Sequence, residues 1–139
     1  MFTDYRTKLT EPRQFHIRKE IILLLGNDPE AGRVMRRTLE ALGFPVLTAD
    51  SCEQAADLFR SFNGAIRLLI IDIATPGKGA LEVIAALREC NPTFKVIVAS
   101  REVSPKERHE IYVSGVIELI RKPLDKEQLL RVVHRIVQN

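Results

Sequence analysis

Short apolar runs alternate with amphipathic segments along most of this chain. The runs at 20–25, 67–73 and 94–99 are rich in Ile, Leu and Val but too short for helices, and those at 46–49 and 116–120 are similar. After each run, apolar residues recur every three or four positions, which is the spacing of one buried helix face. The sequence therefore predicts five strands, each followed by a helix.

Polar residues mark where these helices start. Asp28 precedes Pro29 and an apolar repeat that stops at Gly43, which predicts a helix over roughly 29–42. Three later helices open on polar pairs, of which the first two are typical of a capping box. These pairs are Ser51 with Gln54, Ser104 with Glu107, and Asp125 with Gln128.

The strict alternation of strands and helices decides the fold class. Strands joined through helices lie parallel, and right-handed crossovers place the helices on both faces of the sheet. Strands buried on both faces are continuously apolar, as Leu68 to Ile71 are. We expect an α/β fold, a doubly wound sheet of five parallel strands with five helices in three layers.

Four of the apolar runs end in polar residues suited to phosphoryl chemistry. Asp28, Asp72, Ser100 and Lys122 follow or close these runs. In a parallel sheet the carboxyl ends of the strands meet at one edge, so residues far apart in sequence converge there. A carboxylate nucleophile, a hydroxyl, a lysine and a second carboxylate for a metal are expected to meet in one pocket.

Length and charge indicate one domain behind a basic arm. The 139 residues suit a single domain, and the net charge of +3 lies entirely in residues 1–19, which hold five Lys/Arg against two Asp/Glu. This arm has no aromatic stacking pattern, so we interpret it as a solvated extension rather than a nucleic-acid contact. We expect the domain itself to span residues 20–139.

Neither a membrane anchor nor a secretory signal is expected. No apolar run approaches the roughly 20 residues that span a bilayer. The first twenty residues also lack the apolar stretch of a signal peptide. We therefore expect no membrane association and a cytoplasmic location.

The strand-end residues also carry a family resemblance. Asp72 lies in the segment DIATPG, Ser100 closes the fourth apolar run, Gly115 precedes the fifth, and Lys122 is followed by Pro123. These landmarks and their spacing resemble the receiver domain of bacterial two-component response regulators. The resemblance covers roughly residues 20–139, and it implies a flavodoxin-like sheet with strand order 2-1-3-4-5.

This resemblance implies a role for each matched residue. Asp72 would be the phosphoacceptor, with Ser100 and Lys122 holding the transferred oxygens and magnesium neutralising charge. The phosphodonor would be a sensor histidine kinase, a phosphotransfer protein or a small acyl phosphate. The fourth helix, fifth strand and fifth helix would form a switching surface for a downstream partner, an output domain or a homodimer.

The chain departs from the family at its expected metal site. Gly26 and Asn27 stand where receivers usually have two acidic residues. The remaining candidate ligands are Asn27, Asp28, Asp72 and the backbone carbonyl of Ala74, so we expect magnesium to bind weakly or not at all. Asp28 has two alternative roles, as a metal ligand or as the cap of the first helix.

Two further departures concern access and switching. Arg101 follows Ser100 where the family usually has a small residue, which makes Arg101 a candidate gate over Asp72. Leu119 occupies the switch position, three residues before Lys122, where many receivers carry an aromatic side chain.

Three functions remain open at this point. The first is a working receiver phosphorylated on Asp72, and the second is a degenerate receiver that acts as a phosphorylation-independent interaction module. The third, a flavin- or nucleotide-binding enzyme, lacks support because no glycine-rich phosphate loop follows the first strand. We expect no enzyme activity beyond self-phosphorylation from a phosphodonor and autodephosphorylation.

Overall fold

The computed structural model confirms the predicted sheet. It describes residues 20–26, 28–62, 64–72, 78–90, 93–101 and 103–138. Five parallel strands are hydrogen-bonded in the order β2-β1-β3-β4-β5. The strands are β1 (Ile21–Gly26), β2 (Val46–Ala49), β3 (Ile66–Asp72), β4 (Lys95–Ser100) and β5 (Glu118–Arg121).

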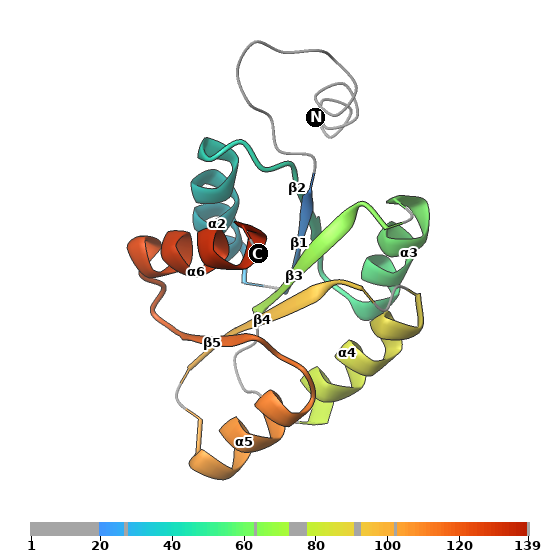
Figure 1. Ribbon diagram of the computed structural model, residues 1–139, viewed down its shortest axis with the longest axis vertical. Helices are drawn as coiled ribbons and strands as arrows, with labels where there is room; N and C mark the ends of the chain where they lie inside the picture. The colour runs from blue at the N-terminus through green and yellow to red at the C-terminus, as the bar shows by residue number, and fades with distance from the viewer. Residues whose placement is uncertain are drawn as a thin grey trace.

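Helices cover both faces of the sheet, which gives three layers (Figure 1). Two helices, α2 and α6, pack on one face, and three helices, α3, α4 and α5, pack on the other. The helices are α2 (Pro29–Ala41), α3 (Cys52–Phe62), α4 (Lys78–Cys90), α5 (Pro105–Val113) and α6 (Lys126–Gln138).

The central strands explain the continuous apolar runs. Successive side chains of a strand point to opposite faces of the sheet. On β1, Ile22 and Leu24 contribute to the core beneath α2 and α6, while Leu23 and Leu25 contribute to the core on the other face. Because both faces are covered, every one of these positions is buried.

Ser51, Ser104 and Asp125 each accept a hydrogen bond from the first turn of the helix that they precede. Ser104 Oγ accepts a hydrogen bond from Glu107 N at 3.1 Å, and Glu107 Oε1 accepts one from Ser104 N at 3.1 Å, which is the complete capping box of α5. Ser51 Oγ likewise accepts from Gln54 N, but the Gln54 side chain accepts from Asp50 N at 2.8 Å instead of from the Ser51 amide.

Element boundaries differ from the predicted ones by one or two residues. The structure ends β3 at Asp72, so this aspartate is the last residue of its strand. The fifth strand begins at Glu118 and not at Val116, although Ile117 N already donates to Val96 O at 2.8 Å.

The predicted basic arm at 1–19 lies outside the described residues. Within the described segments, no helix is both long and apolar enough to cross a membrane.

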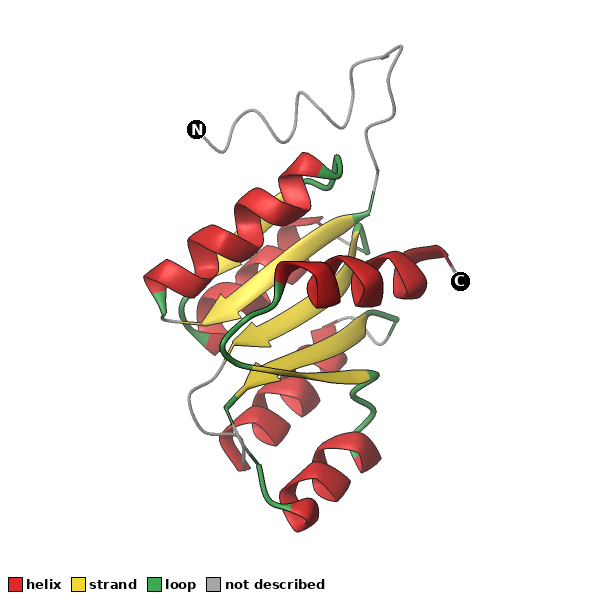
Figure 2. Ribbon diagram, turned by 90° about the vertical axis from the view of Figure 1, so that its left-hand side faces the viewer, coloured by secondary structure: helices red, strands yellow, loops and turns green. Residues whose placement is uncertain are grey.

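The sheet brings the strand ends to one edge, as Figure 2 shows by the common direction of the arrowheads. Gly26 ends β1, Asp72 ends β3 and Ser100 ends β4. Lys122 directly follows β5, and its amide donates to Ser100 O at 2.7 Å. The candidate chemistry therefore lies at the carboxyl edge of the sheet.

Candidate functional site

A buried ion pair forms the centre of this edge. Lys122 Nζ lies 2.6 Å from Asp72 Oδ1, and the two side chains are only 13% and 5% exposed. The lysine reaches the aspartate because β5 and β3 flank β4 on its two sides. Two residues 50 positions apart in the chain are thus in direct contact, as the sequence predicts.

Asp28 caps the first helix, as one of its two predicted roles requires, and its second carboxylate oxygen faces the site. Its Oδ1 accepts a hydrogen bond from Ala31 N at 3.3 Å and caps α2. Its Oδ2 lies 3.3 Å from Lys122 Nζ. One carboxylate oxygen therefore serves the helix and the other faces the site, so the two alternatives are compatible.

The electrostatics of these three groups are linked. Hydrogen bonding from the Ala31 amide, followed by that from Lys122, lowers the pKa of Asp28. Burial by itself would lower the pKa of Lys122, but hydrogen bonding to Asp72 and the charge of Asp72, assisted by Asp28, outweigh burial and raise the pKa. Lys122 is therefore a fixed cation at neutral pH.

The lowered pKa of Asp28 predicts a pH dependence of stability. A carboxyl group whose pKa is lower in the folded state stabilises the fold above its unfolded pKa, about 3.9, and this contribution is lost as the pH falls through the folded value. Urea unfolding from about pH 6 downwards should therefore show a shallower acid loss of stability in Asp28→Asn than in wild type. Equal slopes for the two proteins would contradict this assignment.

Two buried polar atoms at this edge, Ser100 Oγ and Asp72 Oδ2, have no hydrogen-bond partner among the described residues. Ser100 is fully buried, and its Oγ has no hydrogen-bond partner among the described residues. Within the same set, Asp72 Oδ2 has none either, and Asp72 contacts only Lys122 through Oδ1. Unsatisfied buried polar atoms are costly, so they indicate a place where a bound group supplies the missing contacts.

Asp28 and Asp72 can hold a hard cation, although the site has fewer carboxylates than receivers usually have. Asp28 and Asp72 both face Lys122 Nζ, while Asn27 and Ala74, the other two predicted ligands, lie outside the described residues. The described segments contain no group of three or more His, Cys, Asp or Glu side chains that could hold a metal. Magnesium in proteins often uses only one or two carboxylates and keeps several waters. Asp28 and Asp72 would hold such an ion, in competition with Lys122.

Gly26 lies against β3 at a point where there is no room for a side chain. It pairs with Asp72 in the ladder between β1 and β3. A Cβ atom placed on Gly26 would lie 2.6 Å from Asp72 O and 3.0 Å from Asp72 Cβ. Position 26 therefore lacks the carboxylate that receivers usually have there, and β3 leaves no room for any side chain at this position.

Two cavities open at the carboxyl edge. An open cavity of about 390 Å³ lies between β1, β2 and α2, and its lining includes Gly26, Asp28 and Asp72. A smaller one of about 150 Å³ is lined by Ser100, Arg101, Val103, Arg108, Leu119 and Arg121.

The positions predicted as gate and switch both line the smaller cavity. Arg101 is exposed and is not among the residues that line the cavity containing Asp72. Leu119 lies beside the buried Ser100, as a switch position would require. The gating role of Arg101 and the switching role of Leu119 remain predictions.

Three residues near Leu119 escaped the sequence analysis. Tyr112 on α5 accepts a hydrogen bond from Leu119 N at its hydroxyl oxygen, at 3.2 Å. Arg108 and Arg121 line the smaller cavity. Arg121 directly precedes Lys122 at a strand end and could have been noticed there, but α5 shows no helical stripe that would indicate which way Arg108 faces.

The fold and the site together define a class of protein. A doubly wound sheet that gathers a buried aspartate, a serine and a lysine at its carboxyl edge is the arrangement of a receiver-type signalling domain. The family model of the response regulator receiver domain matches residues 22–134. The chain belongs to this family.

Two relatives that resemble the chain over most of its length are transcriptional regulators. Transcriptional regulatory protein CpxR of Escherichia coli (strain K12) is 30% identical over 117 residues, which cover 84% of this chain and 49% of CpxR. The cell cycle transcriptional regulator CtrA of Caulobacter vibrioides is 24% identical over 119 residues, which cover 84% of this chain and 50% of CtrA. The chain thus spans about half the length of these relatives.

Solved structures support the same fold. The receiver domain of HemR from Leptospira biflexa, in its non-phosphorylated form, superposes with a TM-score of 0.76 at 21% identity and covers 87% of this chain and 96% of that one. A CheY-like receiver domain protein from Methanospirillum hungatei gives a TM-score of 0.75 at 20% identity, with 87% and 95% covered. At these identities the likeness concerns the fold alone.

Proposed function

We propose that this domain accepts a phosphoryl group on Asp72. The observation that carries the proposal is the buried Asp72–Lys122 pair, together with a buried Ser100 hydroxyl that has no hydrogen-bond partner among the described residues. The donor would be a sensor histidine kinase, a phosphotransfer protein or a small acyl phosphate. The nucleophile, the cation and the hydroxyl needed for such a transfer lie at one edge of the sheet.

The proposed transfer assigns one task to each residue. A carboxylate oxygen of Asp72 attacks phosphorus, and the bond from phosphorus to the donor nitrogen or oxygen breaks, with the electron pair leaving on the donor. Lys122 Nζ and Ser100 Oγ would hold the phosphoryl oxygens, and a magnesium ion on Asp28 and Asp72 would neutralise charge. Attack of water on the phosphoryl group would return the free carboxylate, so the domain would turn over no external substrate beyond its donor.

The output of this step would be a change at the surface formed by α5, β5 and α6. Phosphorylation would replace the Asp72 carboxylate that Lys122 faces with a phosphoryl group. The phosphoryl oxygens would also give the Ser100 hydroxyl, which lies next to Leu119, a hydrogen-bond partner. The largest exposed apolar side chains among the described residues lie there or at its border, namely Tyr112, Val113 and Ile117. This surface would bind a downstream partner, an output domain or a second copy of the chain.

A second candidate is a receiver that signals without phosphorylation. Two observations favour it: Gly26 leaves no room for a metal-binding side chain, and Lys122 already neutralises Asp72. In this case the ion pair would hold the domain in one state, and the protein would act only as an interaction module.

Intact mass measurement with acetyl phosphate across a magnesium titration separates these candidates. The proposal expects a wild-type adduct of one phosphoryl group that increases with magnesium and is absent in Asp72→Asn. If wild type gives no adduct at any magnesium concentration and Asn27→Asp does, the second candidate is correct. Asn27→Asp is the suitable restoring variant because Gly26→Asp would collide with β3. An adduct that persists in Asp72→Asn would contradict both.

A further inference from the structure

The helix α5 is attached to the core less firmly than α6. Of the nine residues of α5, all of which the structure describes, only Ile111 is buried. In contrast, α6 buries at least four apolar side chains, namely Leu129, Val132, Val133 and Ile136. Ordering nine residues costs conformational entropy that one buried side chain does not offset. The position of α5 therefore depends on contacts outside the core.

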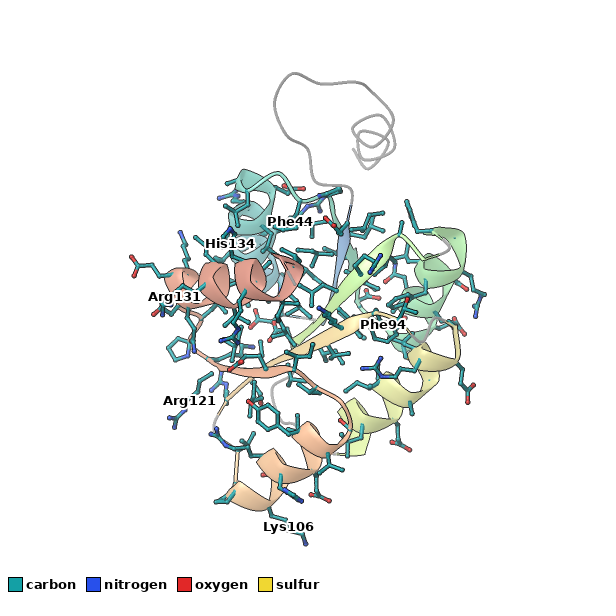
Figure 3. All side chains as sticks on the ribbon, in the orientation of Figure 1. Phe44, Phe94, Lys106, Arg121, Arg131 and His134 are labelled. Carbon is teal, nitrogen blue, oxygen red and sulfur yellow. The ribbon has the colours of Figure 1, made fainter. Side chains whose placement is uncertain are left out.

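Two hydrogen bonds within the described residues join the C-terminal end of α5 to its neighbours. Tyr112 Oη accepts a hydrogen bond from Leu119 N of β5 at 3.2 Å. Arg88 Nη2 of α4 donates to the carbonyl oxygen of Gly115, two residues beyond the helix, at 3.4 Å. The opposite end of the helix, at Lys106, lies away from the sheet (Figure 3). Loss of a contact at the attached end would therefore allow α5 to move relative to β5.

Leu119 connects the Tyr112 contact with the buried Ser100. Leu119 and Ser100 line the same cavity of about 150 Å³, and the amide of Leu119 donates to Tyr112. In the ladder between β4 and β5, Leu119 pairs with Val98, two residues before Ser100. Because protein interiors are closely packed, a group that enters beside Ser100 displaces Leu119. Such a displacement acts directly on the hydrogen bond to Tyr112.

The outer end of this connection lies at the surface. Tyr112 is 37% exposed, and the apolar side chains of Val113 and Ile117 near it in the chain are 71% and 40% exposed. A movement of Tyr112 therefore changes an apolar surface that a protein partner can contact.

We propose that Tyr112 is a positioning residue that couples the Ser100 cavity to the exposed face of α5. Its hydrogen bond to the Leu119 amide holds α5 against β5 in the arrangement described above. Phosphoryl oxygens that bind Ser100 Oγ would displace Leu119 and break this bond. Leucine at the predicted switch position has no polar side-chain group, so the hydroxyl comes from α5 instead. The proposal rests on the proposed function only for the identity of the group that reaches Ser100.

Amide hydrogen exchange of Tyr112→Phe, followed by nuclear magnetic resonance, tests the contact without a phosphodonor. The variant keeps the ring and removes only the hydroxyl. We expect exchange at Leu119 to accelerate about fivefold, which corresponds to the loss of one hydrogen bond. Exchange at Ile97, which is fully buried in β4, should change less than about twofold. Equal acceleration at both amides would indicate only a global loss of stability, and wild-type exchange at Leu119 would contradict the contact.

Ser114→Ala is the matched control, because it also removes one hydroxyl at the end of α5. Ser114 Oγ donates to Ile111 O at 2.6 Å, so its bond lies within the helix end. Exchange at Leu119 should stay within about twofold of wild type in this variant. Acceleration equal to that in Tyr112→Phe would overturn the assignment to Tyr112.

A double-mutant cycle with Ser100→Thr tests the coupling. Threonine keeps the hydroxyl and adds one methyl group at a fully buried position of the cavity that Leu119 lines. In protein with isotope-labelled tyrosine, Ser100→Thr should shift the ring resonances of Tyr112 and accelerate exchange at Leu119. In the Tyr112→Phe background it should add less than about a twofold acceleration. Independent effects on Leu119 exchange, or unchanged Tyr112 ring resonances, would overturn the coupling.

The same exchange measurement with acetyl phosphate and magnesium separates this proposal from phosphoryl transfer itself. The intact mass of each sample reports whether the protein carries an adduct. With an adduct, exchange at Leu119 should rise about fivefold in wild type and should not rise further in Tyr112→Phe. An adduct without this rise contradicts the coupling and leaves the transfer standing. Absence of an adduct contradicts the transfer, and the Ser100→Thr cycle then decides the coupling.

Discussion

Replacing Lys122 with methionine should destabilise the protein by about 3 kcal/mol or more in urea unfolding. The reason is the burial of Asp72, whose side chain is only 5% exposed and has its one close cation in Lys122 among the described residues. Methionine retains most of the side-chain length but leaves the carboxylate charged, poorly hydrated and without a counter-charge. Asp28 would lose its cation as well.

Two companion variants make this prediction specific. Lys126→Met removes an exposed lysine just beyond the site and should change stability by less than about 0.5 kcal/mol. Adding Asp72→Asn to Lys122→Met should restore much of the loss, because an amide is less costly to bury than an unpaired carboxylate. If Lys122→Met unfolds at the same urea concentration as Lys126→Met, the ion pair contributes nothing to the fold.

Gly26→Ala should destabilise the fold by about 1 to 3 kcal/mol, although it adds only one methyl group. The new Cβ would lie 2.6 Å from the backbone oxygen of Asp72. Backbone atoms of two hydrogen-bonded inner strands cannot move aside as the end of a flexible side chain can. The end of β1 must therefore shift away from β3, and the ladder between Gly26 and Asp72 should weaken.

Gly32→Ala provides the matched comparison for this substitution. A Cβ on Gly32 would meet nothing within 4 Å, and the residue lies within α2. Since alanine favours the helix over glycine, Gly32→Ala should stabilise the protein by about 0.5 to 1 kcal/mol. Urea unfolding and amide hydrogen exchange at β1 measure both variants. Gly26→Ala with wild-type stability and exchange would show that the strands have room to separate.

The prediction for Gly26 changes how the incomplete acidic site is understood. A comparison of sequences treats Gly26 as a lost carboxylate that one substitution could restore. The structure instead shows a close contact between two strands, so the replacement would disturb the backbone that carries Asp72. Gly26 is therefore not a position at which a carboxylate can be added without moving β3.

Much of the site followed from the order of residues alone. The alternation of apolar runs and helical stripes predicted a parallel sheet, and a parallel sheet places the ends of its strands at one edge. Asp72, Ser100 and Lys122 could therefore be brought together without coordinates. The observed strand ends differ from the predicted ones by one or two residues. The reason is that hydrogen bonding continues or stops according to the partner strand and not according to the apolar pattern.

The sequence by itself determined the fold class, the strand order implied by the family resemblance and the three residues at the centre of the edge. Only the tertiary structure decided that Asp28 caps α2 and faces Lys122 at once, that Gly26 touches β3, and that three arginines share a cavity with Ser100. The difference has a physical cause. Periodicity and capping are local, and they fix which element a residue belongs to, whereas spacing between strands and the direction of long side chains depend on how separate elements pack.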